Sequence, residues 1–182
     1  MKKLALKIGF VGTHGAGKSS GATFLAARLK QKYPETSVKV LEENVRAIKR
    51  ILGGDLNTPT FQKLVIADQL RRELVETSIH EIVICDRTTI DPLVYSELLS
   101  TLPPEEYVNL ALSNVKTFDI IYFIRPDSYN QSIIDDGFRF TDKKLRNQVD
   151  KKFEELLYKH NIAHIELTTQ KIFSHNYEKD IL

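Results

Sequence analysis

The stretch Gly12-Thr13-His14-Gly15-Ala16-Gly17-Lys18-Ser19 lies between an apolar run at residues 6–11 and a segment whose apolar residues have helical spacing. It fits the pattern G-x-x-x-x-G-K-[ST], in which glycines let the backbone curl so that successive N–H groups point at phosphate oxygens. The dipole of the following helix adds positive charge at the same place. We therefore expect a phosphate-binding loop, with Lys18 on the phosphates and the hydroxyl of Ser19 on Mg²⁺. The residues predicted to contact a nucleotide are Gly12, Thr13, His14, Gly15, Ala16, Gly17, Lys18, Ser19 and Ser20.

Length and composition indicate a single domain over residues 1–182. Of these 182 residues 42% are hydrophobic, so the chain can bury a core of its own. Charges of both signs are interspersed and sum to +2, and without a dense Lys/Arg cluster we expect no nucleic-acid partner. The single Cys85 suits a reducing cytoplasm, and no apolar run approaches the roughly 18 residues of a membrane span. Residues 1–6 superficially resemble a signal peptide, but Lys7 interrupts them and we predict a first strand instead.

Hydrophobic periodicity predicts alternating strands and helices. Strands are expected at residues 6–11, 38–41, 81–86, 119–124 and 163–167. Helices are expected at residues 20–33, 45–52, 58–78 and 142–160, with further helix starts at Asp91-Pro92 and at residues 103–106. The apolar face predicted for the helix at residues 58–78 consists of Phe61, Leu64, Val65, Leu74 and Val75. The alternation implies right-handed crossovers, and hence an α/β fold in which a parallel sheet has helices on both faces.

Candidate site residues follow the predicted strands, where the carboxyl ends of a parallel sheet border a ligand crevice. Asp86 ends the third strand, and we interpret it as a holder of Mg²⁺ or its water shell rather than a solvated loop residue. Arg87 comes next and is open to two interpretations, a contact to the acceptor or to the transferring phosphoryl group, or a salt bridge. The candidate partners for such a salt bridge are Glu42, Glu43 and Asp91.

Two of these carboxylates allow both a chemical and a structural role. Glu43, at the end of the second strand, could accept the proton of an attacking hydroxyl, or it could cap the next helix and pair with Arg46. Asp91 precedes a proline at a helix start, which is typical of an N-cap. Its second carboxylate oxygen could at the same time face a substrate. Both alternatives stay open at the level of the sequence.

The irregular polar stretch at about residues 125–142 is interpreted as a lid. Phosphoryl transfer must be shielded from water and needs added positive charge at the γ-phosphate, which Arg139 could supply, with Gly137 allowing the turn. Arg125, at the start of the stretch, is a candidate for a second positive charge. The alternative is a surface turn, since Asp-Gly is a common turn pair.

The order of these elements resembles small phosphate-loop kinases. The resemblance rests on residues 12–19, Glu43-x-x-Arg46, Asp86-Arg87 followed by Asp91 and Tyr95, and Asp136-Gly-Phe-Arg139. The sequence is similar especially to the ATPase-domain group that includes the ribosylnicotinamide kinase domain and, more distantly, to thymidylate and deoxynucleoside kinases. The resemblance implies a three-layer P-loop NTPase fold whose five-stranded parallel sheet has the order 2-3-1-4-5. It also implies Mg²⁺, transfer of the γ-phosphoryl group of ATP, and a lid arginine near the donor nucleotide.

The sequence departs from these kinases at two points. Thr88-Thr89 follow Asp-Arg where thymidylate kinases usually have an aromatic residue or Ser, and the chain has no Trp, so the acceptor stays open. The predicted catalytic residues are Lys18, Glu43, Asp86, Arg87 and Arg139. The predicted substrate-binding residues are Glu43, Arg46, Arg87, Asp91, Arg125 and Asp136. The predicted metal ligands are Ser19 and Asp86.

The leading hypothesis is an ATP-dependent phosphotransferase that moves the γ-phosphoryl group of Mg-ATP to a nucleoside, a nucleotide or a related metabolite. Candidate acceptor contacts on the helix at residues 58–78 are Gln62, Gln69 and Arg72. The alternative is a nucleotide-binding switch or slow NTPase without an acceptor. The Asn-Lys-x-Asp and Asp-x-x-Gly motifs of regulatory GTPases are missing from the expected places. We expect a cytoplasmic protein with a small-molecule acceptor and no membrane partner, and the sequence leaves a homodimer open.

Overall fold

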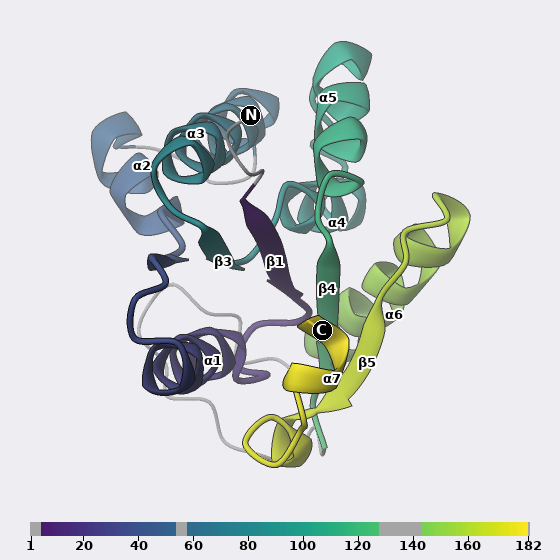
Figure 1. Ribbon diagram of the computed structural model, residues 1–182. Coiled ribbons are helices and arrows are strands. Elements are labelled where there is room, and N and C mark those ends of the chain that lie inside the picture. The colour runs from purple at the N-terminus through teal and green to yellow at the C-terminus, as the bar shows by residue number, and fades with distance from the viewer. Residues whose placement is uncertain (1–4, 54–57, 128–142, 182) are drawn as a thin grey trace.

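A parallel β-sheet forms the centre of the protein (Figure 1). The computed structural model describes residues 5–53, 58–127 and 143–181. Over these residues the sheet has five strands: β1 Leu6–Val11, β2 Val38–Leu41, β3 Ile82–Asp86, β4 Ile120–Arg125 and β5 Ile165–Thr168. Their order is β2-β3-β1-β4-β5, and every neighbouring pair is parallel. The predicted fold class and strand order are therefore confirmed.

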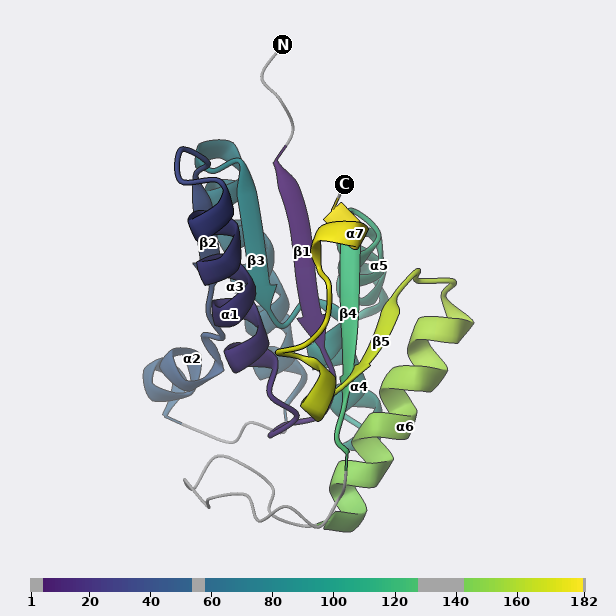
Figure 2. The same cartoon turned by 60° about the horizontal axis from the view of Figure 1, so that its bottom comes forward.

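Helices cover both faces of the sheet (Figure 2). On one face lie α1 Lys18–Lys32, the short helix η1 Thr169–Lys171 and α7 Glu178–Ile181. On the other face lie α3 Pro59–Ile79, α4 Ile90–Leu98, α5 Glu105–Val115 and α6 Lys143–Lys159. The helix α2 Val45–Leu52 packs against α3. These three layers are the arrangement in which a parallel sheet buries both of its faces.

The alternation of side chains along β4 divides the core in two. Tyr122 and Ile124 are fully buried in the cluster with α1, whereas Ile121 and Phe123 are buried in the cluster with α4, α5 and α6. Because successive side chains of a strand point to opposite faces, a strand buried on both faces needs a continuous apolar run. The near-continuous apolar character of residues 119–124 predicted this placement.

The register of the central strand brings the site residues together. In β1, Phe10 lies opposite Asp86 of β3 and Tyr122 of β4. The carboxyl ends of these three strands therefore lie side by side. The loop after β1 begins directly beside Asp86. This is the carboxyl end of the sheet, where open α/β folds bind their ligands.

Three of the five residues predicted for the apolar face of α3 are exposed, two of them in its second half. Leu74 and Val75 are exposed, by 64% and 44%, and Leu64 is also exposed. The inward side instead carries polar side chains, and Glu73 is only 1% exposed. The reason is the position of α3 above the sheet, where its polar groups find hydrogen-bond partners that the helical periodicity cannot reveal.

The structure also shows the environments of Lys7 and Cys85. The run interrupted by Lys7 is a strand, as predicted, and Cys85 is a fully buried core residue of β3. Over the described residues, no helix combines the length and apolar character that a membrane crossing requires.

Candidate active site

The loop between β1 and α1 adopts the curled conformation expected of a phosphate-binding loop. Gly12, Gly15 and Gly17 have φ angles of 137°, 71° and 93°, in the left-handed region that favours glycine. A Cβ atom at Gly12 would lie 2.3 Å from the carbonyl oxygen of Ile124 in the adjacent strand. The first glycine of the motif is therefore required both by its backbone angle and by the close approach of β4.

Lys18 places its ammonium group inside this loop. Its Nζ donates hydrogen bonds to the carbonyl oxygens of Gly12 at 2.9 Å and of Thr13 at 2.8 Å, and the side chain is buried. Burial, assisted by the nearby positive charge of Arg87, lowers the pKa of Lys18 to about 8. An anion entering the loop would replace the carbonyl contacts with stronger charge-assisted ones.

Ser19 and Asp86 lie next to each other beside the phosphate-binding loop. The hydroxyl of Ser19 donates to Oδ2 of Asp86 at 2.5 Å. The other carboxylate oxygen of Asp86, Oδ1, is buried and has no hydrogen-bond partner among the described residues. A buried carboxylate oxygen without a partner is costly unless it meets a donor or a cation. The pair therefore fits Mg²⁺, which prefers oxygen ligands and keeps several waters.

Arg87 is held between two carboxylates. Its Nε lies 2.8 Å from Oε2 of Glu43, and its Nη1 donates to Oδ1 of Asp91 at 3.3 Å. The backbone of Arg87 has a φ of 88°, which costs a residue with a side chain about 1–3 kcal/mol and persists only where the surroundings impose it. The salt-bridge interpretation of Arg87 is thus realised, with Glu43 and Asp91 as its two partners.

The two carboxylates that flank Arg87 differ in their proton affinity. Burial by itself would raise the pKa of Glu43, but the Arg87 guanidinium beside it outweighs this effect and lowers the pKa overall. Burial also raises the pKa of Asp91, here to about 6, and Arg87 offsets only part of the effect. Environments that separate the pKa values of paired carboxylates are typical of sites with acid and base chemistry.

Asp91 is not the N-cap of α4 that its sequence context suggested, but its side chain does bond to the backbone at the start of this helix. Its Oδ2 accepts a hydrogen bond from the backbone N–H of Thr88 at 2.9 Å, just before α4 begins at Ile90. The contact stabilises the first turn of α4, because it satisfies a backbone N–H just before the helix, much as in a capping box. Asp91 lies inside the first turn rather than at the N-cap itself. Its other oxygen meets Arg87, so both carboxylate oxygens are used.

A pocket opens beside the phosphate-binding loop. It has a volume of about 160 Å³ and is walled by α2, α3, α4 and the ends of β2 and β3. The polar lining includes His14, Glu43, Arg46, Gln62, Arg87 and Asp91, and the apolar lining includes Ile48, Phe61, Val65 and Pro92. At one side Nδ1 of His14 lies 3.3 Å from the hydroxyl of Tyr95. A concave site with an apolar lining and a few convergent polar groups is typical of small-molecule binding.

This pocket brings together four of the six predicted substrate-binding residues, namely Glu43, Arg46, Arg87 and Asp91. Of the three candidate acceptor contacts on α3, Gln62 and Gln69 line it, whereas Arg72 instead donates to the carbonyl oxygen of Glu42 at 2.8 Å. The apolar wall was not predicted from the sequence. The resemblance included Tyr95, but its contact with His14 was not predicted, although Tyr95 follows Asp91 by one helical turn. That helical spacing was the available signal.

Arg125 is not brought to the pocket. Its guanidinium donates to Asp150 at 3.0 Å and to Glu154 at 3.0 Å, two residues one turn apart on α6. This placement corrects the expected substrate contact, since the charge of Arg125 is already used to dock α6 against β4. The lid prediction at about residues 125–142 falls mainly on residues 128–142, and Asp136 and Arg139 lie outside the described residues.

Comparisons with known proteins agree with this architecture. The family model described as AAA domain matches residues 7–173. The structure is similar to thymidylate kinase from Ehrlichia chaffeensis, with a TM-score of 0.66 and 16% identity over 98% of this chain and 99% of that one. It is also similar to the NadR protein in complex with NR, with a TM-score of 0.65 and 19% identity over 90% of this chain but 44% of that one. No curated protein sequence gives a significant match.

Proposed function

The chain belongs to the AAA domain family, and from the geometry of its site we propose that it is an ATP-dependent phosphotransferase. It would move the γ-phosphoryl group of Mg-ATP to a small acceptor, a nucleoside, a nucleotide or a related metabolite. One observation carries the proposal: the pocket beside the phosphate-binding loop shares His14 with that loop and is bordered by Arg87, Glu43 and Asp91. A nucleotide switch without an acceptor has no use for such a second compartment.

The donor side is built from the loop and the end of β3. The backbone N–H groups of the loop and the ammonium of Lys18 would bind the phosphates. Ser19 and Asp86 would hold Mg²⁺, which when bound neutralises charge on the β- and γ-phosphate oxygens. Lys18 and Arg87 would stabilise the charge that spreads over the transferring group. Little covalent chemistry remains for the protein, so positioning and electrostatic stabilisation would supply most of the rate.

The acceptor side would position one hydroxyl for attack. In the reaction the acceptor oxygen forms a bond to the γ-phosphorus and the bond to the leaving ADP oxygen breaks. If the acceptor is a nucleoside or sugar, its hydroxyl proton passes to a carboxylate, whereas a nucleotide attacks through a phosphate oxygen that is already ionised. Glu43 is the proposed proton acceptor, because its lowered pKa keeps it ionised at neutral pH. Asp91 would orient the acceptor through Arg87. The roles of Arg139 over the phosphates and of Asp136 at the acceptor stay predictions.

The size of the pocket limits the acceptor. A volume of about 160 Å³ is below the range of roughly 300–1,000 Å³ usual for drug-sized ligands. It favours a small acceptor over a large one. The names of the structural neighbours support including thymidylate and ribosylnicotinamide among the candidates. A cytoplasmic location and the absence of a nucleic-acid partner are kept as predictions from composition.

A thermal-shift panel tests the proposal. The protein is saturated with Mg²⁺ and a non-hydrolysable ATP analogue, and thymidine, thymidylate and ribosylnicotinamide are added one at a time, followed by other nucleosides. A ligand at one hundred times its Kd stabilises the folded state by about 2.7 kcal/mol, so an acceptor should raise the melting temperature beyond the shift due to the analogue.

Turnover then separates the two functions. A phosphotransferase consumes ATP much faster when its acceptor is added, whereas a switch or slow NTPase responds to nucleotide alone. If no compound shifts the melting temperature and none changes the rate of ATP consumption, the acceptor pocket has no catalytic role. A nucleotide-binding switch or slow NTPase is then favoured.

A further inference from the structure

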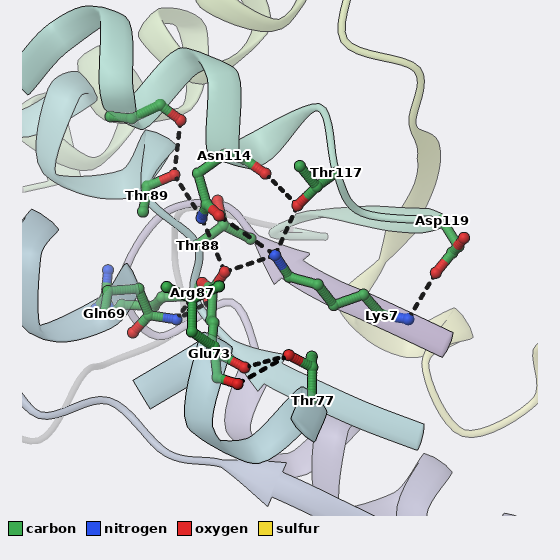
Figure 3. Close-up of polar contacts among 12 residues, drawn as sticks. Lys7, Gln69, Glu73, Thr77, Arg87, Thr88, Thr89, Asn114, Thr117 and Asp119 are labelled. Carbon is green, nitrogen blue, oxygen red and sulfur yellow. Dashed lines mark hydrogen bonds and ion pairs between the residues drawn. The ribbon is translucent and has the colours of Figure 1, made fainter. Parts of the chain in front are cut away.

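A buried ion pair connects β1 to α3 (Figure 3). The ammonium of Lys7 lies 2.8 Å from Oε2 of Glu73, and both side chains are almost completely buried. Lys7 also donates to the hydroxyl of Thr117 at 2.7 Å, and Nδ2 of Asn114 donates to the same oxygen of Glu73 at 2.8 Å. Buried ion pairs contribute little net stability, because desolvation offsets most of the attraction. The Lys7–Glu73 pair is therefore expected to do something other than stabilise the fold.

Gln69 extends this network to the active site. Its Nε2 donates to Oε1 of Glu73 at 2.7 Å and to the backbone carbonyl oxygen of Arg87 at 3.3 Å, so one amide group joins the two (Figure 3). A carboxylate can only accept hydrogen bonds, whereas an amide can donate from one side and accept on the other. Glu73 therefore determines that the NH₂ side of Gln69, rather than its carbonyl oxygen, faces the carbonyl of Arg87.

Arg87 needs such support, because its backbone is in the left-handed region with a φ of 88°. Its N–H donates to the carbonyl oxygen of Phe10 at 3.0 Å, which anchors it to β1. Its carbonyl oxygen is the group that Gln69 holds. The two contacts together determine the orientation of the residue, and hence the direction in which its guanidinium extends to Glu43 and Asp91.

We propose that Gln69 is a positioning residue of the phosphotransfer reaction. Buried Glu73 orients the Gln69 amide, and this amide holds the backbone carbonyl of Arg87. The Arg87 guanidinium is thereby kept between Glu43 and Asp91. The proposal rests on the proposed function for its catalytic consequence. The geometric part, that Gln69 controls the placement of Arg87, can be tested without turnover. The competing explanation is that the network only stabilises the fold.

The first test compares four variants by kinetics. Gln69→Leu removes the amide, and Glu73→Gln removes the group that orients it. The third variant combines the two changes, and Thr117→Val removes a hydrogen bond at the far end of the network as a matched control. Each is assayed with Mg-ATP and whichever of thymidine, thymidylate and ribosylnicotinamide the wild type turns over fastest.

Misplacing a catalytic group by a fraction of an ångström to 1 Å can reduce turnover by about 100-fold. We expect Gln69→Leu to lower kcat by this order while the KM for ATP changes less than about twofold, because the phosphate-binding loop is untouched. Glu73→Gln should act in the same direction, and the double variant should be no worse than Gln69→Leu, since Glu73 acts through Gln69. Thr117→Val should lower the melting temperature without changing kcat. If Glu73→Gln does not fold, Lys7→Met/Glu73→Gln removes both charges together and takes its place.

A second readout follows Arg87 itself. In wild type the buried Nε of Arg87 lies 2.8 Å from Oε2 of Glu43 in an ion pair, so its N–H should be shielded from water and give a slowly exchanging NMR signal, identified by its loss in Arg87→Lys. The signal should disappear or exchange rapidly in Gln69→Leu and persist in Thr117→Val. The proposal would be overturned if Gln69→Leu left both kcat and the Arg87 NMR signal unchanged. It would also be overturned if the loss of kcat in the double variant were the product of the losses in the two single variants. If the wild type transfers no phosphoryl group but the signal is lost in Gln69→Leu, the proposed function fails and the control of Arg87 by Gln69 stands.

Discussion

The hydroxyl of Ser19 donates to the carboxylate of Asp86 at 2.5 Å, although the two residues lie 67 positions apart in the chain. Ser19 belongs to the first turn of α1, and Asp86 is the last residue of β3. The contact follows from the parallel pairing of β1 with β3, which aligns Phe10 with Asp86. Two oxygen ligands thus converge where the phosphate-binding loop ends, and the second oxygen of Asp86 stays without a hydrogen-bond partner among the described residues.

Asp86→Asn should therefore raise the Mg²⁺ concentration needed for half-maximal turnover. Replacing a group that holds the ion or its waters typically costs 10–100-fold in metal affinity, and we expect an increase of about that size. Mg²⁺ titration of ATP consumption measures it, and a chelator should abolish turnover in the wild type. Asp119→Asn is the control, because it makes the same carboxylate-to-amide change where the side chain, within the described part of the chain, accepts only the backbone N–H of Lys7, at the other end of β1. An unchanged Mg²⁺ requirement in Asp86→Asn would argue against the metal site.

Lys18→Ala should lower kcat by at least about 100-fold, the effect of losing one preorganised donor to developing charge. The fold should be preserved, because the variant removes a buried cation whose desolvation is unfavourable. Circular dichroism and turnover measured on the same sample check both parts. Lys30→Ala on the same helix, where the lysine bonds only to the carbonyls of Pro34 and Thr36 among the described residues, should behave like wild type. Full activity of Lys18→Ala would contradict the mechanism.

Nucleotide binding should take up protons near pH 8. The pKa of Lys18 is lowered to about 8, so close to half of the molecules carry a neutral amine there. Phosphate oxygens favour the charged form and raise this pKa, which implies an uptake of about half a proton per nucleotide at that pH. Calorimetry with a non-hydrolysable ATP analogue in two buffers of different ionisation enthalpy measures the uptake. Lys18→Arg stays charged and should lack this contribution, so equal uptake in both proteins would contradict the assignment.

Asp91 should make stability fall as the pH rises from about 4 to 7. Its folded-state pKa is raised to about 6, so between the unfolded and folded values the native protein binds the proton more tightly than the unfolded chain does. Its contribution is greatest in acid and is lost as the carboxyl ionises, by up to about 3 kcal/mol. Urea denaturation of wild type and Asp91→Asn across this range gives the difference. A difference that stays constant with pH would show that Asp91 does not titrate as described.

Gly12→Ala should be among the most damaging substitutions in the chain, with a loss of about 4 kcal/mol or more in the free energy of unfolding. The added Cβ would meet the carbonyl oxygen of Ile124 at 2.3 Å in a backbone with a φ of 137°. Gly53→Ala provides the matched control, because its φ is 60° and nothing lies within 4 Å of the new atom. That variant should lose only about 1–2 kcal/mol, the cost of the left-handed conformation. Equal losses in urea denaturation would remove the steric argument.

Local patterns in the sequence were sufficient for most of the fold. The helix expected at residues 58–78 is α3, and in the structure the hydroxyl of Thr58 caps it by accepting the N–H of Phe61 at 3.1 Å. The strand order was implied only by the resemblance to small phosphate-loop kinases. The phosphate-binding loop and the apolar strands β3 and β4, by contrast, were predicted from local patterns. These features depend on neighbours within a few residues, or on a periodicity that a single element carries by itself.

What the sequence by itself determined is the parallel sheet, the loop at residues 12–19 and the group of polar residues at the carboxyl ends of the strands. Only the tertiary structure decided that Arg87 pairs with Glu43 and Asp91, that Arg125 pairs with α6, and that the second half of α3 turns Gln69 and Glu73 inward. The physical reason is that a polar side chain is stable on either face of a helix if it finds a partner when buried. The partners here, as with Gln69 and Arg87, come from other elements and are known only once the elements are packed.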